Sequence, residues 1–185
     1  MIPFLILSAQ DQDLPADWHF EAPGRNKIAW YQSPNYRPRP EGAIVDTIVL
    51  HHTAGNSLEG TTKWFTMRRS RVSAHFTVGA DGSIIQHVST YDRAAHAGTS
   101  RGSDGRPGLN DSSVGIEIDH PGDPNTPYPD AQVEAVEHLV SVLMRRFPIS
   151  TITSHKYIAL PAGRKPDPIN YPWHTLHRFG VEIVP

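Results

Sequence analysis

The chain of 185 residues contains no cysteine. This absence excludes disulfide bonds, thiolate nucleophiles and zinc sites with cysteine ligands. Any metal ligands must therefore come from the eleven histidines and from the carboxylates. The chain also lacks a strong charge of either sign, because its formal net charge is -2. A near-neutral chain gives no reason to expect nucleic acid or an anionic membrane as the main partner.

A long apolar run is missing as well, so we expect no transmembrane segment. Residues 1–9 are apolar, but no lysine or arginine precedes them, and the run is short for the apolar part of a signal peptide. We interpret this stretch as a strand or arm that packs on the domain, with a targeting remnant as the alternative. The 17 prolines exceed the usual share of about 5%. High thermal stability is a hypothesis from this composition.

The length of the chain indicates one domain with a sizeable core. Residues 10–43 are rich in proline, aspartate and arginine and show weak periodicity, so we expect an irregular extension there. We divide the chain into an N-terminal extension, residues 1–40, packed on the core, and a main domain, residues 41–185. The main domain would carry any active site.

Short runs rich in β-branched residues predict the strands, at residues 44–52, 73–79, 83–88, 113–120 and 151–154. Ala80-Asp81-Gly82 indicates a hairpin turn between the second and third of these runs. One helix is expected from Asn56 or Ser57 to about Arg71. A second helix begins with Pro129 at its first position. Its apolar side chains follow the spacing of one buried face, at Val133, Val136, Val140, Leu143, Met144 and Phe147. This pattern predicts an α/β fold, a single-domain sandwich with a central mixed β-sheet flanked by helices.

The predicted strand at residues 44–52 ends in two adjacent histidines, His51 and His52. Side chains alternate between the faces of a strand. His51 therefore shares one face with Val45 and Val49, and His52 shares the other with Leu50. Only one of the two histidines can point into a given site, and the alternation alone does not say which.

Potential metal ligands follow the predicted strands: one of the two adjacent histidines, then His155, then Asp167. Strand ends and the loops after them are where α/β proteins assemble their sites. Two imidazoles and one carboxylate leave a fourth position for water, the usual composition of a catalytic zinc site. Glu117 lies on another predicted strand, and its side chain points to the face opposite that of Ile116 and Ile118. A carboxylate in a partly buried site needs a hydrogen-bond partner or a nearby cation.

Five motifs occur in one order along the chain, and together they are specific although no single one is. They are Ile48-Val49-Leu50-His51-His52-Thr53-Ala54; Ser73-Ala74-His75-Phe76 with Asp81-Gly82; Ala95-His96-Ala97-Gly98; Ser113-Val114-Gly115-Ile116-Glu117; and His155 with Gly163-Arg164-Lys165-Pro166-Asp167-Pro168. Through these motifs, residues 40–178 resemble the zinc-dependent N-acetylmuramoyl-L-alanine amidases of type 2. These amidases share their fold with peptidoglycan-recognition proteins and phage lysozyme-like amidases.

The resemblance implies a set of site residues. It implies that the first histidine of the pair, His51, binds Zn²⁺ together with His155 and Asp167. It also implies that Glu117 and Lys165 occupy catalytic positions. An ordered zinc site of this kind activates water and polarises a carbonyl group.

The resemblance also places His96 in the lining of the substrate groove. We expect His75 near the site as a substrate contact, with a structural role as an equal alternative. Many relatives carry tyrosine where this chain has Ala74. A catalytic role for that tyrosine is absent here, so we expect Glu117 to take a larger part in catalysis. Others carry cysteine where this chain has Asp167, and a carboxylate is a harder but sound zinc ligand.

The reaction that the resemblance implies is hydrolysis of the amide between the lactyl group of N-acetylmuramic acid and L-alanine of the stem peptide. Glu117 would act as general base and pass the proton to the leaving amine. Lys165 would stabilise the oxyanion. We expect a monomer that acts on peptidoglycan or a muropeptide, either in cell-wall lysis like a phage endolysin or in wall turnover. Release by lysis, secretion and a cytoplasmic recycling role all fit this expectation.

Two other functions fit parts of the pattern. A non-catalytic peptidoglycan-binding module would keep the groove after loss of a metal ligand, but all three proposed ligands are present. A non-haem iron(II) oxygenase also uses two histidines and one carboxylate. Such iron sites usually lie in β-barrels, whereas the pattern here is α/β.

Overall fold

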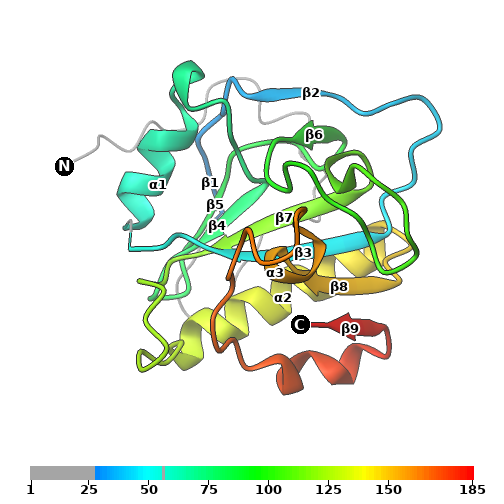
Figure 1. Cartoon of the computed structure of the whole chain (residues 1–185). Coiled ribbons are helices and arrows are strands. Elements are labelled where there is room, and N and C mark those ends of the chain that lie inside the picture. The colour runs from blue at the N-terminus through cyan, green and yellow to red at the C-terminus, as the bar shows by residue number, and fades with distance from the viewer. Residues whose placement is uncertain (1–27, 56) are drawn as a thin grey trace.

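The computed structural model describes residues 28–55 and 57–185, and its centre is a seven-stranded sheet (Figure 1). The strand order is β1-β5-β4-β7-β3-β8-β9. β4 and β5 are antiparallel, and all other neighbours in this sheet run parallel. A second, two-stranded sheet pairs β2 with β6. The strands are β1 (Ala29–Trp30), β2 (Tyr36–Pro38), β3 (Thr47–His52), β4 (Phe76–Val78), β5 (Ile84–Gln86), β6 (Asp92–Ala94), β7 (Ser113–Ile118), β8 (Thr151–Ser154) and β9 (Glu182–Val184).

Helices flank the sheet, as the sequence predicts for an α/β sandwich. They are α1 (Leu58–Phe65), α2 (Asp130–Arg146), α3 (His155–Ile158) and the 3₁₀ helices η3 (Arg68–Ser70), η4 (Leu109–Asp111) and η5 (Trp173–Phe179). The long helix α2 covers one face of the sheet, where its apolar side chains join those of β3, β4 and β7 in the main core (Figure 1). A smaller cluster on the other face contains Val49, Ala97, Leu109 and Ile158. No helix in the described part of the chain is both long and apolar enough to cross a bilayer.

The side chains of β3 alternate as predicted within the strand, but Val45 does not follow the pattern. Val45 packs in the main core with Ile48 and Leu50 and does not share a face with His51. The strand begins only at Thr47. Alternation relates side chains within one regular strand, so it does not extend to a residue that precedes it.

The expected irregular extension contains two short strands in its described part. β1 pairs in parallel with β5 at the edge of the central sheet, and β2 pairs with β6. Strands of two and three residues are too short to show an alternating pattern, so the sequence does not reveal them. Residues 1–27, with the apolar stretch, lie outside the described residues. The division of the chain at residue 40 stays a prediction.

Directly after β2, Arg39 anchors this segment to the domain. Its guanidinium donates hydrogen bonds to the backbone carbonyls of Thr90, Asn110, Asp111 and Ser113. Burial lowers the pKa of Arg39 to about 10, which still leaves the group charged at pH 7. The segment before residue 41 is therefore tied to the loops that surround η4.

The predicted helix boundaries need small corrections. Ser57 caps α1 by accepting a hydrogen bond from the N–H of Gly60, while Asn56 lies outside the described residues. The helix ends at Phe65, earlier than predicted, and η3 follows it before Arg71 adopts a left-handed φ of 56°. Pro129 is the residue before α2 rather than its first residue.

Candidate active site

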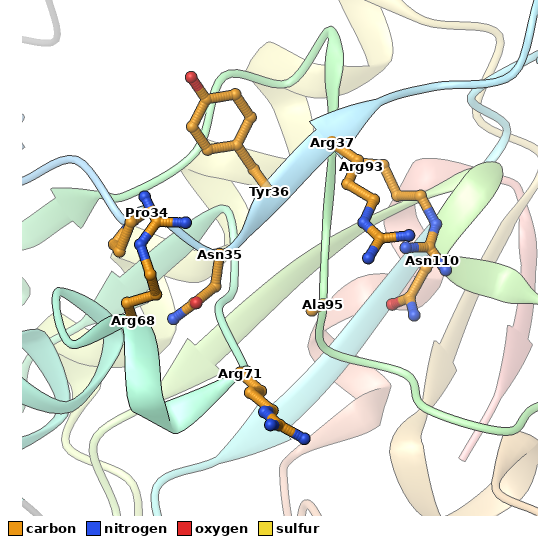
Figure 2. A pocket seen from close by; sticks show the side chains of 9 residues that line it. All are labelled: Pro34, Asn35, Tyr36, Arg37, Arg68, Arg71, Arg93, Ala95 and Asn110. Atoms are coloured by element: carbon orange, nitrogen blue, oxygen red, sulfur yellow. The ribbon is translucent and has the colours of Figure 1, made fainter.

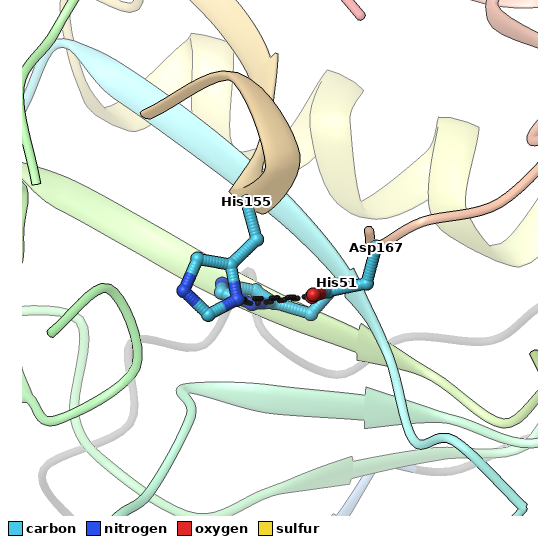
Figure 3. A group of neighbouring side chains, drawn as sticks. All are labelled: His51, His155 and Asp167. Atoms are coloured by element: carbon cyan, nitrogen blue, oxygen red, sulfur yellow. Dashed lines mark hydrogen bonds and ion pairs between the residues drawn. The ribbon is translucent and has the colours of Figure 1, made fainter. Parts of the chain in front are cut away.

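The ends of three parallel strands bring the predicted site residues together. β3 pairs with β7 and with β8, and this register places His51 beside Glu117. β8 ends at Ser154, whose hydroxyl caps the short helix α3, and His155 is the first residue of that helix. The loop after α3 returns Asp167 to the same edge of the sheet (Figure 3). The site therefore lies at the carboxyl ends of the strands, the usual position in open α/β sheets.

Three ligand atoms converge there. His51 Nδ1 lies 2.9 Å from His155 Nδ1, and His155 Nδ1 lies 3.0 Å from Asp167 Oδ2. The distance from His51 Nδ1 to Asp167 Oδ2 is 3.3 Å (Figure 3). All three residues are buried. Within the described residues, they form a group of side chains with the composition and spacing of a metal site.

Hydrogen bonds alone do not satisfy these three atoms. If both imidazoles carry hydrogen on Nδ1, two N–H groups face each other; if only one does, a nitrogen lone pair faces the carboxylate oxygen. A shared cation removes this conflict. In a tetrahedral zinc site with ligand bonds of about 2.0–2.2 Å, neighbouring ligand atoms lie roughly 3.3–3.5 Å apart, close to the observed distances. The residues therefore fit zinc and leave a fourth position for water.

The protonation states of His51 and Asp167 also suit a metal. Burial, and then the charge of His155, lower the pKa of His51 to about 4, so its imidazole is neutral at pH 7. Burial by itself would raise the pKa of Asp167, but the close contacts with the imidazoles of His155 and His51 hold it well below its usual range. Neutral imidazole and ionised carboxylate are the forms that bind metal ions.

Glu117 and Lys165 line the same cleft, a cavity of about 290 Å³. Glu117 Oε2 is buried and has no hydrogen-bond partner. Burial, and then the charge of Asp167, raise the pKa of Glu117 to about 8, while Lys165 acts in the opposite direction. A carboxyl group with a perturbed pKa beside a metal site is a candidate for proton exchange with water or substrate.

His52 contributes no atom to the group of three ligands. Its ring stacks on His120 with 5.8 Å between centroids, and its Nδ1 accepts a hydrogen bond from the N–H of Ile169 at 3.2 Å. It borders the cleft but supports the loop that follows Asp167. The geometry thus selects His51 of the two adjacent histidines, in agreement with the motif resemblance.

The structure places His96 in the lining of the cleft and His75 outside it. His96 lines the cleft, and its Nδ1 lies 3.0 Å from His51 Nε2. His75 is 0% exposed and lines no part of the cleft. Its Nδ1 accepts from the N–H of Gly115 at 2.9 Å, and its Nε2 lies 3.1 Å from the carbonyl of Asp92. We therefore correct the expected substrate contact of His75: these bonds tie the residue before β4 to β7 and to β6, which is the structural alternative.

A second cavity, of about 650 Å³, adjoins the cleft, and Ala95 lines both. Figure 2 shows its lining, which includes the side chains of Arg37, Arg68, Arg71 and Arg93. None of the nine lining residues is a carboxylate. We call this space the arginine cavity. It offers several guanidinium groups to an anionic ligand that reaches it from the cleft.

The sequence analysis did not identify the arginine cavity. The three arginines in residues 68–71 were the available signal, but such a run is usually a solvated surface. Arg37 and Arg93 join them only because β2 pairs with β6, where these two residues stand opposite each other. Arg93 also forms an ion pair with Asp111 at the wall of the cavity.

Comparisons with known proteins identify the family of the chain. Residues 41–170 match the family model described as N-acetylmuramoyl-L-alanine amidase. The 1,6-anhydro-N-acetylmuramyl-L-alanine amidase AmpD of Citrobacter freundii is 33% identical over 172 residues, which cover 83% of this chain and 88% of that protein. The N-acetylmuramoyl-L-alanine amidase AmiD of Escherichia coli is 29% identical, over 76% of this chain and 55% of that protein.

Solved structures show the same relationship. A crystal structure of a selenomethionine derivative of AmpD superposes with a TM-score of 0.70 at 30% identity, and the match covers 89% of this chain and 98% of that one. The complex of E. coli AmiD with anhydro-N-acetylmuramic acid-L-Ala-D-γ-Glu-L-Lys superposes with a TM-score of 0.65 at 29% identity, over 79% of this chain and 62% of that one. The chain therefore belongs to the N-acetylmuramoyl-L-alanine amidase family and is an amidase.

Proposed function

We propose that the chain uses zinc to hydrolyse the amide between the lactyl group of N-acetylmuramic acid and L-alanine of a stem peptide. The observation that carries the proposal is the convergence of His51, His155 and Asp167, two of which line one cleft together with Glu117 and Lys165. The iron oxygenase alternative loses its support, because the three ligands lie in an α/β sandwich of the amidase family.

The proposed mechanism divides the chemistry among these residues. His51, His155 and Asp167 would hold the zinc ion, which would supply a Lewis acid for the scissile carbonyl and lower the pKa of water. Glu117 accepts a proton from the attacking water and delivers it to the leaving nitrogen of L-alanine, so one C–O bond forms as the C–N bond breaks. Lys165 donates to the oxyanion, a contribution of roughly 2.7–4 kcal/mol for single donors of this kind.

Glu117 must be ionised when it accepts the proton. Its burial raises its pKa, and the charge of Lys165 opposes that effect. A bound cation beside it favours the ionised form in the same way. Lys165 and a bound cation would thus lower the pKa of Glu117 towards the pH at which it has to accept a proton.

The substrate that we propose is a soluble 1,6-anhydromuropeptide, as in wall recycling. Relatives with this activity in their name match most of both chains. A Clostridium intestinale endolysin amidase is matched at 19% identity, where the likeness concerns the fold alone. The lytic or secreted role that we kept as an expectation therefore has no support of its own. We propose that a monomer suffices, because one chain supplies every group in the mechanism.

The arginine cavity suits the acidic part of such a substrate. The ligand in the AmiD complex carries a D-γ-Glu residue after L-alanine. Carboxylates pair strongly with guanidinium groups, often through two hydrogen bonds. We propose that the stem peptide extends from the cleft past Ala95 into the arginine cavity.

Mass spectrometry of parallel digests tests this function. Purified peptidoglycan and a soluble 1,6-anhydromuropeptide are each incubated with the zinc-loaded protein. We expect free stem peptides with a new alanine amine, without new reducing sugars, and faster release from the soluble substrate. Binding without release would support the non-catalytic module instead. Equal or faster release from intact wall would contradict the recycling substrate.

A further inference from the structure

The second nitrogen of His51 belongs to a chain of hydrogen bonds that leads away from the metal site. His51 Nε2 lies 3.0 Å from His96 Nδ1, and His96 Nε2 lies 3.2 Å from Ser113 Oγ. The hydroxyl of Ser113 donates in turn to the backbone carbonyl of Leu109. All four residues are buried, so water competes little for these bonds.

The direction of every bond follows from the far end of the chain. A hydroxyl has one hydrogen, and Ser113 gives it to Leu109, so Ser113 Oγ must accept from His96 Nε2–H. A neutral His96 with hydrogen on Nε2 has a bare Nδ1, which accepts from His51 Nε2–H. His51 Nδ1 is then left without hydrogen. This is the atom that faces His155 and Asp167.

We propose that His96 is a positioning residue that fixes the tautomer and ring orientation of His51, so that His51 Nδ1 is presented to the metal. The inference rests on the metal centre of the proposed function and gives His96 a role beyond the lining of the substrate groove. Partners that orient a metal-bound histidine typically change metal affinity by about 10- to 100-fold when they are removed.

The surroundings hold His96 in place for this role. The N–H groups of His96 and Ala97 both donate to Asn110 Oδ1, at 3.0 Å and 2.8 Å. The His96 ring packs directly over Gly115 of β7, where a Cβ atom would lie 2.4 Å from His96 Cγ. A glycine at this position therefore leaves the space that the ring occupies.

The two metal-binding histidines differ in this respect. His155 Nε2 is buried without a hydrogen-bond partner, whereas His51 Nε2 has His96. The orientation of His51 thus depends on a side chain that can be replaced. Because the acceptor is a neutral imidazole and not a carboxylate, it does not add to the basicity of His51 as a carboxylate partner would.

Zinc affinity of His96 variants tests the inference. The dissociation constant for zinc is measured on the metal-free protein by competition with a chromophoric chelator. His96→Phe removes the acceptor, and we expect zinc to bind about 10- to 100-fold more weakly. His96→Asn places an amide oxygen near the position of Nδ1, and we expect it to recover most of the affinity. His87→Gln is the matched control, because His87 is also buried but bonds to Thr77 and Tyr31, away from the metal site.

The tautomers themselves are measured on the unaltered protein by long-range ¹H–¹⁵N NMR of the imidazoles, which keeps the test valid if a variant fails to fold. We expect hydrogen on Nε2 of both His51 and His96. Hydrogen on His96 Nδ1 would overturn the inference. So would unchanged zinc affinity in His96→Phe with a raised KM, which would assign His96 to substrate alone. A wild-type protein that binds no zinc would instead contradict the proposed function.

Discussion

The two faces of the central sheet carry opposite kinds of side chain, although the same strands supply both. Under α2, Ile48, Leu50 and Ile116 belong to a continuous apolar core. On the opposite face, the same strands present His51 and Glu117 side by side at their carboxyl ends. Alternation along a strand separates the two sets by a single residue. One face therefore holds the main apolar core, and the other combines a smaller apolar cluster with buried polar groups for chemistry.

The adjacent residues His51 and His52 show this contrast at its sharpest. Both are buried, yet His51 belongs to the group of three candidate metal ligands, and His52 accepts a hydrogen bond from the backbone of Ile169. Residue type therefore does not define the role of a histidine here. The face of the strand and the groups that meet it do.

The largest expected effect comes from removing a ligand on the polar face. Asp167→Ala leaves two imidazoles, and we expect zinc affinity to fall by more than about 100-fold, beyond the range for partners outside the ligand set. Amidase activity should fall with it. Metal analysis and activity are measured on the same sample. Stoichiometric zinc with full activity in this variant would contradict the assignment of Asp167 as a metal ligand.

Glu117→Gln separates catalysis from metal binding on that face. The amide keeps the shape of the side chain but does not accept a proton, so we expect kcat to fall by at least about 10²-fold. Zinc content should stay stoichiometric. Steady-state kinetics with metal analysis checks both values, and a rate near that of the wild type would remove Glu117 from the mechanism.

A substitution in the apolar core under α2 should lower stability and leave zinc affinity nearly unchanged. Leu139 is fully buried in the core under α2. We expect Leu139→Ala to lower the free energy of unfolding by about 2–5 kcal/mol through lost contacts and a cavity. Zinc affinity of the folded protein should change little, because the substitution lies on the other face. Denaturant unfolding and chelator competition measure the two quantities, and a large loss of zinc affinity would show that the faces are coupled.

His87 sharpens the comparison because it is a buried polar residue without a place in the mechanism. Burial lowers its pKa to about 4. Between the ordinary value of about 6.5 and this value, the unfolded chain binds a proton that the folded chain does not. The contribution of His87 to the free energy of unfolding is therefore complete above pH 6.5 and is lost as the pH falls towards about 4.

Urea unfolding from pH 7 to pH 5 measures this dependence. We expect the slope of unfolding free energy against pH to be smaller in His87→Gln than in the wild type, by at most one proton, or about 1.4 kcal/mol per pH unit. The metal-free protein is used for both, since metal binding has its own pH dependence. Identical slopes would show that His87 titrates normally in the folded protein.

The smallest expected effect concerns the arginine cavity. Arg71 lines it, while the neighbouring Arg69 is exposed and does not. Exposed guanidinium groups contribute about 1 kcal/mol or less to an ion pair, so we expect Arg71→Ala to raise KM by roughly threefold to fivefold with kcat unchanged. Arg69→Ala is the matched control. Equal KM values in the two variants would show that the arginine cavity does not bind the substrate.

The sequence predicts the central strands through runs rich in β-branched residues, and the resemblance to the amidase family supplies the predicted ligand set. β3, β7 and β8 all lie within predicted runs. The short strands β1 and β2 escape prediction, because two or three residues show no periodicity. The arginine cavity depends on the pairing of β2 with β6, a contact between distant segments. Likewise, no local pattern reveals that Ser113 orients His96, since the direction depends on the carbonyl of Leu109.

The central claim is that one metal ion joins the three ligands of the polar face. Anomalous diffraction at the zinc edge from crystals of the zinc-loaded protein tests it most directly. We expect one strong peak at about 2.0–2.2 Å from His51 Nδ1, His155 Nδ1 and a carboxylate oxygen of Asp167. A peak elsewhere, or none between these three side chains, would contradict the metal centre and the mechanism built on it.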